Sequence, residues 1–490
     1  MHRGLVFNLL SNAVFFASGY VLHFFLGNTM PAAAYGIVGT IITVLDFEYM
    51  FLSNGTRQSI AREISMAQYD DRDVIVKTFL FQMVLVAIFF SINFFGSGVF
   101  SRLLNDDSLG LYFRVAAFLV PANGFYVMLL GISDGLRKFG TTALLGSVYP
   151  VAKLSAIPFM LFVFPSDPVI GVEMGFLFAL VLTAAIGVVL LLLHRHRHRA
   201  PRRSERIPFR TVVHRTLSFS FFFIIVSLVL SIDTLIIKAV APSAASAGYY
   251  TGAVNFGKLS YSLMSAFATI ILPVVSYHLG RGDVEGALGR IRENIELATL
   301  FILPMSVIIS ATSASLLTSF YSSGFVAAAP ALMFLSISHF FMGVLVLLNL
   351  VLASFEGNRF SDILSVASLV IVIPLFIASA RHGGMTGIAL TSMLCTGTGM
   401  FVSLVHVRRR AGNVITRRTV LLAALNAVLW VLLKTVFSRF PIDGLLPLAG
   451  VYILVYVVFL TLLMLCRVIP LPSPAHIRRL LSGGDGGDDR

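Results

Sequence analysis

Long apolar stretches separated by short polar segments make up almost the whole chain. Each stretch has about 20 residues, the length at which an α-helix spans the hydrocarbon core of a bilayer, and about fourteen of them follow one another. They lie near residues 5–27, 33–55, 78–100, 111–133, 141–164, 169–193, 216–240, 247–275, 295–318, 328–354, 361–380, 385–407, 419–437 and 445–466. This pattern predicts an all-α integral membrane protein with almost no chain left for a soluble domain.

The first stretch follows Met1, His2 and Arg3 and has small residues after it, as a secretory signal peptide does. Its apolar part is longer than a signal peptide needs, and a second apolar stretch begins directly afterwards. We therefore expect a retained transmembrane helix.

Polar residues recur at steps of three and four in three of the stretches, and a fourth has polar or small residues at steps of four and seven, so they share one face of each predicted helix. A helix face toward lipid rarely carries polar side chains, so these faces should turn to protein or to water. The faces comprise Thr251, Asn255, Lys258, Ser262, Ser265 and Thr269; Thr43, Asp46, Tyr49, Ser53 and Arg57; Ser227, Ser231, Thr234 and Lys238; and Asn8, Asn12, Gly19 and His23.

Close packing of helices in lipid also favours small residues, and this explanation stays open for the stretches 5–27 and 216–240. It does not account for Lys258 or Asp46, because a charge at the bilayer centre costs about 2.5 to 3.5 kcal/mol and needs a wet or paired site. We therefore predict a cavity between the helices. Its predicted substrate-binding residues are Lys258, Asp46, Lys153, Asn255, Thr251, Ser262, Tyr49 and His23.

Other charges within the apolar stretches have two interpretations each. Lys153 either pairs with Glu48 or Asp46 or stays free to bind a phosphate. Glu48 is two residues from Asp46 and points to nearly the opposite face. This position favours a paired or protonated group between helices over a second cavity ligand.

Asp233 lies among isoleucines, which favours a basic partner over a place in the cavity. Lys238 ends the polar face of the stretch 216–240. His339 is either a proton carrier or, as we favour, a hydrogen-bonded histidine between helices. We group Asp233, Glu48, Lys238 and His339 as structural or ion-coupling charges.

The two sides of the longest polar insert resemble each other. Ala34-Tyr-Gly-Ile-Val-Gly near the start of the second stretch has a counterpart in Ala247-Gly-Tyr-Tyr-Thr-Gly at the start of the eighth, and Ser133 to Phe139 corresponds to Ser354 to Phe360. An internal repeat of six helices follows. Because six is an even number, an axis along the membrane normal should relate the halves, with the substrate path between them.

This repeat divides the chain into five predicted segments. They are an N-terminal six-helix bundle at 1–193, a basic cytoplasmic linker at 194–215, a C-terminal six-helix bundle at 216–407, two extra transmembrane helices at 408–466 and a cytoplasmic tail at 467–490. We expect the linker to be a solvated tether, because alternating His and Arg side chains repel a metal ion. The tail should form a short surface helix followed by disorder.

The formal net charge of +13 does not require nucleic acid as a partner. With the N-terminus inside, most Lys and Arg residues fall in inside segments, as the positive-inside rule expects. The charge therefore sets a topology with both termini cytoplasmic and meets the headgroups of membrane lipids. Cys395 and Cys466 have no partner at disulfide or metal-ligand spacing, so we expect two small buried side chains.

Several short motifs occur in an order that resembles one transporter family. They are Ile232 to Ile237 followed by Ala247-Gly-Tyr-Tyr250, Leu272-Pro-Val-Val-Ser276 followed by Gly280-Arg-Gly-Asp283, Leu303-Pro304, and His382 to Leu390. With these motifs the chain resembles, over its whole length, the polysaccharide transporters (oligosaccharide-lipid flippases) of the multidrug/oligosaccharidyl-lipid/polysaccharide (MOP) superfamily.

The resemblance implies a V-shaped pair of six-helix bundles around a cationic cavity, two extra C-terminal helices, and alternating access. Members of the family move undecaprenyl- or dolichyl-linked sugars across the membrane. The positions in the matching helices are Lys258, Asp233 and Asp46. Many members have more basic residues in the cavity than this chain does.

The predicted function is the flipping of a polyprenyl-(di)phosphate-linked oligosaccharide, a precursor of O-antigen, capsule, exopolysaccharide or another glycan, across the cytoplasmic (inner) membrane. Lys258 and Lys153 would hold the phosphate head, and the hydroxyl-bearing faces would contact the sugars. We expect no enzymatic activity, cofactor or metal. An H⁺ or Na⁺ gradient or the membrane potential is a candidate driving force, and a polysaccharide polymerase and glycosyltransferases are candidate partners.

Two other functions are weaker alternatives. An ion-coupled drug or metabolite antiporter of the same superfamily would use Asp46 or Asp233 as its coupling carboxylate, but such antiporters usually lack the extra helices near 419–466. A membrane-embedded glycosyltransferase or polymerase would need outer loops larger than Pro165–Pro168 and a catalytic motif, which we do not find in the loops.

Overall fold

The computed structural model describes residues 2–66, 68–195, 205–241, 243–356, 359–466 and 468. Helices make up nearly all of this part of the chain, and no strand occurs in it. Eleven stretches among the described residues are long and apolar enough to cross a membrane. The prediction of an all-α multi-pass membrane protein is confirmed, whereas the number of about fourteen spans stays a prediction.

The first half of the bundle comprises the helices from α1 to α10. They are α1 (His2–Thr29), α2 (Ala32–Phe51), the π-helical turn η1 (Leu52–Arg57), α3 (Gln58–Met66), α4 (Asp71–Phe95), α5 (Ser97–Leu103), α6 (Leu109–Ala116), α7 (Leu119–Gly135), α8 (Phe139–Ala152), the 3₁₀ turn η2 (Lys153–Ser155), α9 (Ala156–Pro158), the π-helical turn η3 (Phe159–Val163) and α10 (Pro168–Arg195). The irregular run from η2 to η3 lies between Pro150 and Phe164. Proline removes a backbone donor and crowds the preceding turn, so a regular helix does not continue through this segment.

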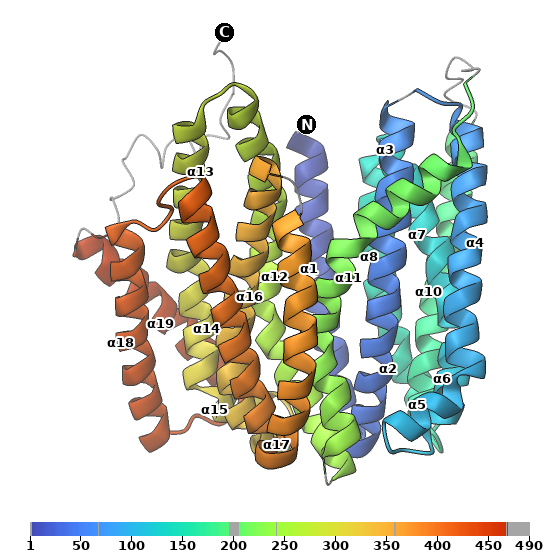
Figure 1. Cartoon of the computed structure of the whole chain (residues 1–490). Helices are drawn as coiled ribbons and strands as arrows, with labels where there is room; N and C mark the ends of the chain where they lie inside the picture. Colours follow the sequence, from blue (N-terminus) through green and yellow to red (C-terminus); the bar gives the residue numbers. More distant parts are fainter. Residues whose placement is uncertain are drawn as a thin grey trace.

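The second half comprises the helices from α11 to α17, and two further helices follow it. They are α11 (Phe209–Val240), α12 (Ala244–Gly280), α13 (Val284–Leu297), the π-helical turn η4 (Ala298–Ile302), α14 (Leu303–Ala311), α15 (Ser313–Phe320), the 3₁₀ turn η5 (Ser323–Ala328), α16 (Ala329–Glu356), α17 (Arg359–Arg410), α18 (Arg417–Arg439) and α19 (Leu445–Leu465). In Figure 1 most helices of both halves run side by side, and α5, α6 and α15 lie at the end opposite the start of α1.

The 52 residues of α17 form two helices that meet at Gly384, whose φ of 54° lies in the left-handed region. A Cβ added to Gly387 would lie 2.5 Å from the carbonyl oxygen of Ser379, so residues on the two sides of Gly384 are in close contact. Glycine accepts both the positive φ and the close approach because it has no Cβ. The two helices correspond to the predicted spans 361–380 and 385–407.

The connection between the halves ends before Phe209, where α11 begins, although the linker was predicted to extend to residue 215. Its last residues are not a free tether: the backbone N–H of Ile207 donates to Asp73 at 2.9 Å, and Lys77 donates to the Ile207 carbonyl at 2.7 Å. From there α11 runs obliquely from α4 toward the middle of the molecule (Figure 1). Residues 196–204 and nearly all of the predicted tail lie outside the described residues.

The helices α18 and α19 pack on the second half beside α14. Trp430 donates to the Ser310 hydroxyl at 3.0 Å, and Tyr456 donates to the Phe301 carbonyl at 3.0 Å. Thr312 forms a further hydroxyl contact with Tyr452. The added helices are therefore tied to one flank of the second half.

The two halves meet most closely where α2 crosses α12. A Cβ added to Gly248 would lie 1.9 Å from the carbonyl oxygen of Ala32, and one added to Gly36 would lie 2.6 Å from the backbone nitrogen of Gly248. Small residues allow such backbone contact between helices in a membrane. Gly36 and Gly248 are also the two glycines that correspond in the predicted repeat, so equivalent positions of the two halves face each other.

A substitution at this crossing should separate α2 from α12. We expect Gly248→Val to lower the thermal stability of the detergent-solubilised protein by several degrees, since overpacking costs about 1–3 kcal/mol. Gly450→Ala in α19 is the matched control, because nothing lies within 4 Å of its added Cβ. Equal melting temperatures for both variants would contradict the close crossing.

Candidate functional site

A polar cavity of about 240 Å³ lies between the halves. Its lining residues in α2 and α12 lie on the C-terminal side of the crossing at Gly36 and Gly248. Helices α1 and α2, the segment around η2, and helices α11 and α12 form its walls. Its polar and charged lining residues are Ser18, Tyr20, His23, Thr43, Asp46, Lys153, Thr234, Thr251, Asn255, Lys258 and Ser262. Seven of the eight predicted substrate-binding residues are therefore brought together at one site.

Asp46, Lys153 and Lys258 are the charged residues of the cavity lining. Asp46 is exposed to the cavity, and both lysines are half-buried. The charges of Lys258 and Lys153 both act on Asp46. Even so, no ion pair among the described residues involves any of the three. The cavity thus presents two ammonium groups and one carboxylate that are available to a ligand.

Lys153 rests on aromatic rings rather than on a carboxylate. Its Nζ lies 4.2 Å from the ring centroid of Phe176 and 5.9 Å from that of Tyr149. These distances are those of cation–π contacts, which stabilise an ammonium group without neutralising it. The predicted pairing with Glu48 or Asp46 is not found among the described residues. Irregular backbone at membrane depth usually lines a cavity, as η2 does here.

The polar faces of α2 and α12 are equivalent in position but opposite in charge. The spacing that relates Gly36 to Gly248 also relates Asp46 to Lys258 and Gly39 to Thr251. A Cβ added to Gly39 would lie 2.3 Å from the Thr251 hydroxyl, so these equivalent positions are also in contact. From this contact the two helix faces extend into the cavity.

The hydroxyl groups of α12 are oriented by their own helix. Thr251 donates to the Ala247 carbonyl at 2.8 Å, and Ser262 donates to the Lys258 carbonyl at 3.0 Å. Each hydroxyl oxygen keeps lone pairs that can accept a further hydrogen bond. The face therefore suits a ligand that is rich in hydroxyl donors.

His23 and Asn255 close the polar network at one end of the cavity. The Nδ1 atom of His23 lies 2.9 Å from the Tyr35 hydroxyl, and the Asn255 amide donates to the same hydroxyl at 2.9 Å. Tyr35 in turn lies 3.3 Å from the hydroxyl of Tyr321, which comes from the second half. The sequence analysis did not propose a role for Tyr35 or Tyr321, although Tyr35 belongs to the motif at Ala34 that indicated the repeat.

Tyr49 does not line the cavity, contrary to its predicted role in substrate binding. Its hydroxyl donates to the Leu119 carbonyl of α7 at 3.4 Å. Tyr49 is three residues after Asp46, so the two side chains could share one helix face, but the Tyr49 ring packs against the hydrophobic core instead. Tyr49 is therefore a packing residue of the first half.

Glu48 and Asp233 are buried away from the cavity, each with 2% of its surface exposed. Glu48 accepts a hydrogen bond from Asn93 of α4 at 2.7 Å, which agrees with the favoured group between helices. Asp233 accepts from the Tyr250 hydroxyl and from the Thr234 N–H, both at 2.7 Å. The partners of Asp233 are thus a hydroxyl group and a backbone N–H, whereas a basic side chain was predicted.

His339 is buried between α16 and α12, and its Nδ1 atom lies 2.8 Å from the Leu335 carbonyl. This partner belongs to its own helix, whereas a bond between helices was expected. A carbonyl accepts but does not donate, so Nδ1 carries the proton. The contact makes His339 a packed histidine of the second half.

Lys238 lies at the far end of α11, where its Nζ forms an ion pair with Asp106 at 2.5 Å. Asp106 belongs to the loop between α5 and α6. Burial alone would raise the pKa of this carboxyl group, but hydrogen bonds from Lys238 and Ser108 outweigh it and leave the pKa below its usual range. The carboxyl group of Asp106 is therefore ionised at neutral pH.

The described residues contain no group of three or more His, Cys, Asp or Glu side chains that could hold a metal ion. Cys395 is half-buried, whereas Cys466 is exposed, contrary to the expectation that both are buried. The chemistry available at the site is therefore that of ammonium, carboxylate, hydroxyl and amide groups.

Comparison with known sequences places the chain in a family. The sequence profile described as polysaccharide biosynthesis protein matches residues 1–278, more than half of the chain. The chain belongs to the polysaccharide biosynthesis protein family. The resemblance drawn from the motifs is confirmed. No curated protein sequence matches the chain significantly.

Solved structures of MOP-superfamily transporters share its fold. The lipid II flippase MurJ in an inward closed conformation has a TM-score of 0.70 at 15% identity, covering 95% of this chain and 100% of that one. An inward-facing multidrug resistance MATE transporter has a TM-score of 0.67 at 15% identity, covering 80% and 94% of the two chains. An outward-facing MATE transporter reaches 0.57 at 17% identity, covering 83% and 93%. The polysaccharide biosynthesis family member thus has the all-α MOP fold.

Two variants test the assignment of Glu48 as a group between helices. Glu48→Gln keeps the Oε1 acceptor for Asn93 and should retain wild-type stability. Glu48→Ala removes this acceptor and leaves the buried Asn93 amide with only its hydrogen bond to the Phe89 carbonyl, so it should cost about 1–3 kcal/mol. Thermal unfolding in detergent measures both. Equal loss in the two variants would show that the negative charge, rather than the hydrogen bond, stabilises this position.

Proposed function

We propose that this protein flips a polyprenyl-phosphate- or polyprenyl-diphosphate-linked oligosaccharide across the cytoplasmic membrane, with both termini in the cytoplasm. Flipping moves the cargo by alternating access and leaves its covalent bonds intact. One observation carries the proposal: the cationic cavity adjoins an apolar groove, so a charged site and an apolar site lie side by side.

The apolar groove has a volume of about 420 Å³ and lies between α12, α14 and α19. It is lined by Phe256, Leu259, Met305, Ile308, Ile309, Leu316, Tyr452, Ile453, Tyr456 and Val457. Leu259 also lines the polar cavity, so the two spaces adjoin at this side chain. An amphiphile with an anionic, hydroxyl-rich head and an isoprenoid tail matches both chemistries.

The cavity side chains have complementary roles toward such a cargo. Lys258 and Lys153 can donate charge-assisted hydrogen bonds to a phosphate, which otherwise pays the cost of leaving water. The hydroxyl groups of Thr251 and Ser262 can accept hydrogen bonds from sugar hydroxyls. Asp46 can accept them as well, and its charge limits how tightly the lysines hold the phosphate. This balance allows the cargo to be released.

The extra helices support a lipid-linked cargo over a drug. α19 supplies Tyr452, Ile453, Tyr456 and Val457 to the groove, so a wall of the apolar site exists only because these helices are present. The match to the polysaccharide biosynthesis family points the same way. The structure of the lipid II flippase MurJ is similar over 95% of this chain. Rocking of the two halves relative to each other would expose the cavity to each side in turn.

The exposed carboxylate of Asp46 favours one second candidate, an ion-coupled antiporter. Reconstituted protein distinguishes the two functions directly. A flippase should move a fluorescent lipid-linked oligosaccharide and leave a cationic drug gradient unchanged, whereas an antiporter should do the reverse. A polysaccharide polymerase and glycosyltransferases remain the proposed partners, because they would use the flipped product and make the cargo.

Lys258 provides the sharpest test of the cavity. We expect Lys258→Ala to lower the flipping rate in proteoliposomes at least about tenfold, because the phosphate loses a charge-assisted hydrogen bond worth about 1.5 kcal/mol or more. Lys258→Arg should keep most of the activity. Lys434→Ala, in α18 and outside the cavity, is the matched control.

The outcomes separate the residue from the function. Unchanged flipping by a correctly folded Lys258→Ala protein would overturn the role of Lys258. Absence of flipping by the wild-type protein would overturn the proposed function itself.

A further inference from the structure

The cavity is closed at the end opposite the start of α1 by contacts between the two halves. We call this end the far side; it is the lower side in Figure 1, where α5, α6 and α15 lie. Two layers of contacts occur there. The inner layer is a group of aromatic rings, and the outer layer contains the ion pair of Lys238 with Asp106.

Tyr35 and Tyr321 form the inner layer, which we call the plug. Their hydroxyl groups lie 3.3 Å apart, and the side chains are 0% and 3% exposed. The ring of Tyr321 stacks on Phe325 with centroids 4.4 Å apart. A Cβ added to Gly27 of α1 would lie 2.3 Å from the Tyr321 ring, so this residue of the second half fits closely against a helix of the first.

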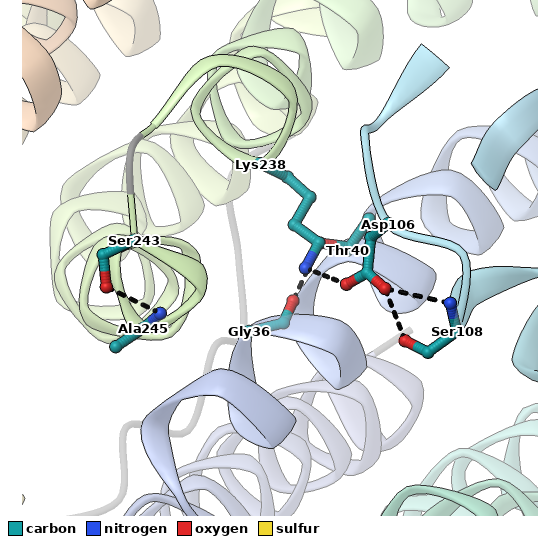
Figure 2. Close-up of polar contacts among 7 residues, drawn as sticks. All are labelled: Gly36, Thr40, Asp106, Ser108, Lys238, Ser243 and Ala245. Carbon is teal, nitrogen blue, oxygen red and sulfur yellow. Dashed lines mark hydrogen bonds and ion pairs between the residues drawn. The ribbon is translucent and has the colours of Figure 1, made fainter. Parts of the chain in front are cut away.

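Lys238 and Asp106 form the outer layer. Figure 2 shows Lys238 extending from α11 beside Gly36 and Thr40 of α2 to reach the carboxylate of Asp106. The neighbouring residues form a second connection, since the Asn105 amide donates to the Ala239 carbonyl at 2.7 Å. Two adjacent bonds therefore join the loop between α5 and α6 to the far end of α11.

The positions of the partners distinguish this pair from an ordinary structural ion pair. Asp106 lies in a loop of the first half and is held by the N–H and hydroxyl of Ser108, at 3.0 and 2.6 Å. Lys238 belongs to the second half and is 8% exposed. If the halves separate on the far side, these two groups must part, and each then requires water.

We propose that the ion pair of Lys238 with Asp106 is a latch that keeps the far side of the cavity closed over the plug. Breaking the latch shifts the equilibrium toward a conformation open on the far side, because the closed conformation alone contains the bond. This inference rests on the proposed function only in taking the two halves to move relative to each other. Its test measures access to the cavity and requires no transport.

The experiment uses a cysteine in the cavity as a reporter. Cys395→Ala and Cys466→Ala remove the native thiols, and Ser262→Cys places a thiol in the cavity lining with little change of volume. A membrane-impermeant thiol reagent is applied to either side of oriented proteoliposomes. Asp443→Cys reports orientation from the far side (the loop between α18 and α19), and Gly289→Cys in α13 reports it from the opposite side.

We expect Asp106→Asn to raise the rate of far-side labelling of the reporter about tenfold, the shift that loss of one differential contact produces. Lys238→Met should have the same effect. Asp107→Asn is the matched control, because Asp107 is exposed and forms no ion pair among the described residues. The exchanged pair Asp106→Lys with Lys238→Asp should return the rate toward that of the wild type.

Two results would overturn the latch. One is a far-side labelling rate in Asp106→Asn equal to that of Asp107→Asn. The other is a far-side labelling rate of the exchanged pair that equals the rates of the single variants, although the exchanged protein elutes from a size-exclusion column as a folded protein. A wild-type protein that does not flip the lipid-linked oligosaccharide would overturn the proposed function. The latch would still stand if far-side labelling is faster in Asp106→Asn than in the wild type.

Discussion

The close crossing of α2 and α12 is the contact on which the rest of the structure depends. Gly36 and Gly248 let two backbones touch, which no larger residue would allow at these distances. Since both helices carry a polar face, their contact at one end opens into a shared polar cavity beyond it. The same crossing joins the two halves at equivalent positions of the repeat.

Four charged residues of α2, α11 and α12 fall into two groups. Glu48 accepts a hydrogen bond from Asn93 and Asp233 accepts one from Tyr250, each inside a single half, and a buried charge or carboxyl group needs such partners to be tolerated. Asp46 and Lys258 have no ion pair among the described residues and face the cavity instead. The first group stabilises the bundles, while the second is free to interact with a ligand.

The adjacency of a cationic cavity and an apolar groove gives the site a shape that a small soluble ligand would not require. The groove exists because α19 packs beside α14, held by hydrogen bonds such as that of Tyr456 to Phe301. Leu259 lines both spaces, so the head and tail of an amphiphile would meet near this side chain. The family match and the MOP fold agree with this interpretation.

The amino-acid sequence by itself determined the helical membrane architecture, the repeat, and the polar faces that carry Asp46, Thr251, Asn255 and Lys258. These properties follow from hydropathy and from helical spacing, which are local. Only the tertiary structure decided that Tyr49 points away from the cavity and that Lys153 lies on aromatic rings. It also decided that Tyr321 reaches α1 and that Lys238 meets Asp106. Such pairings join residues far apart in the chain, and their energies depend on distances that no local pattern encodes.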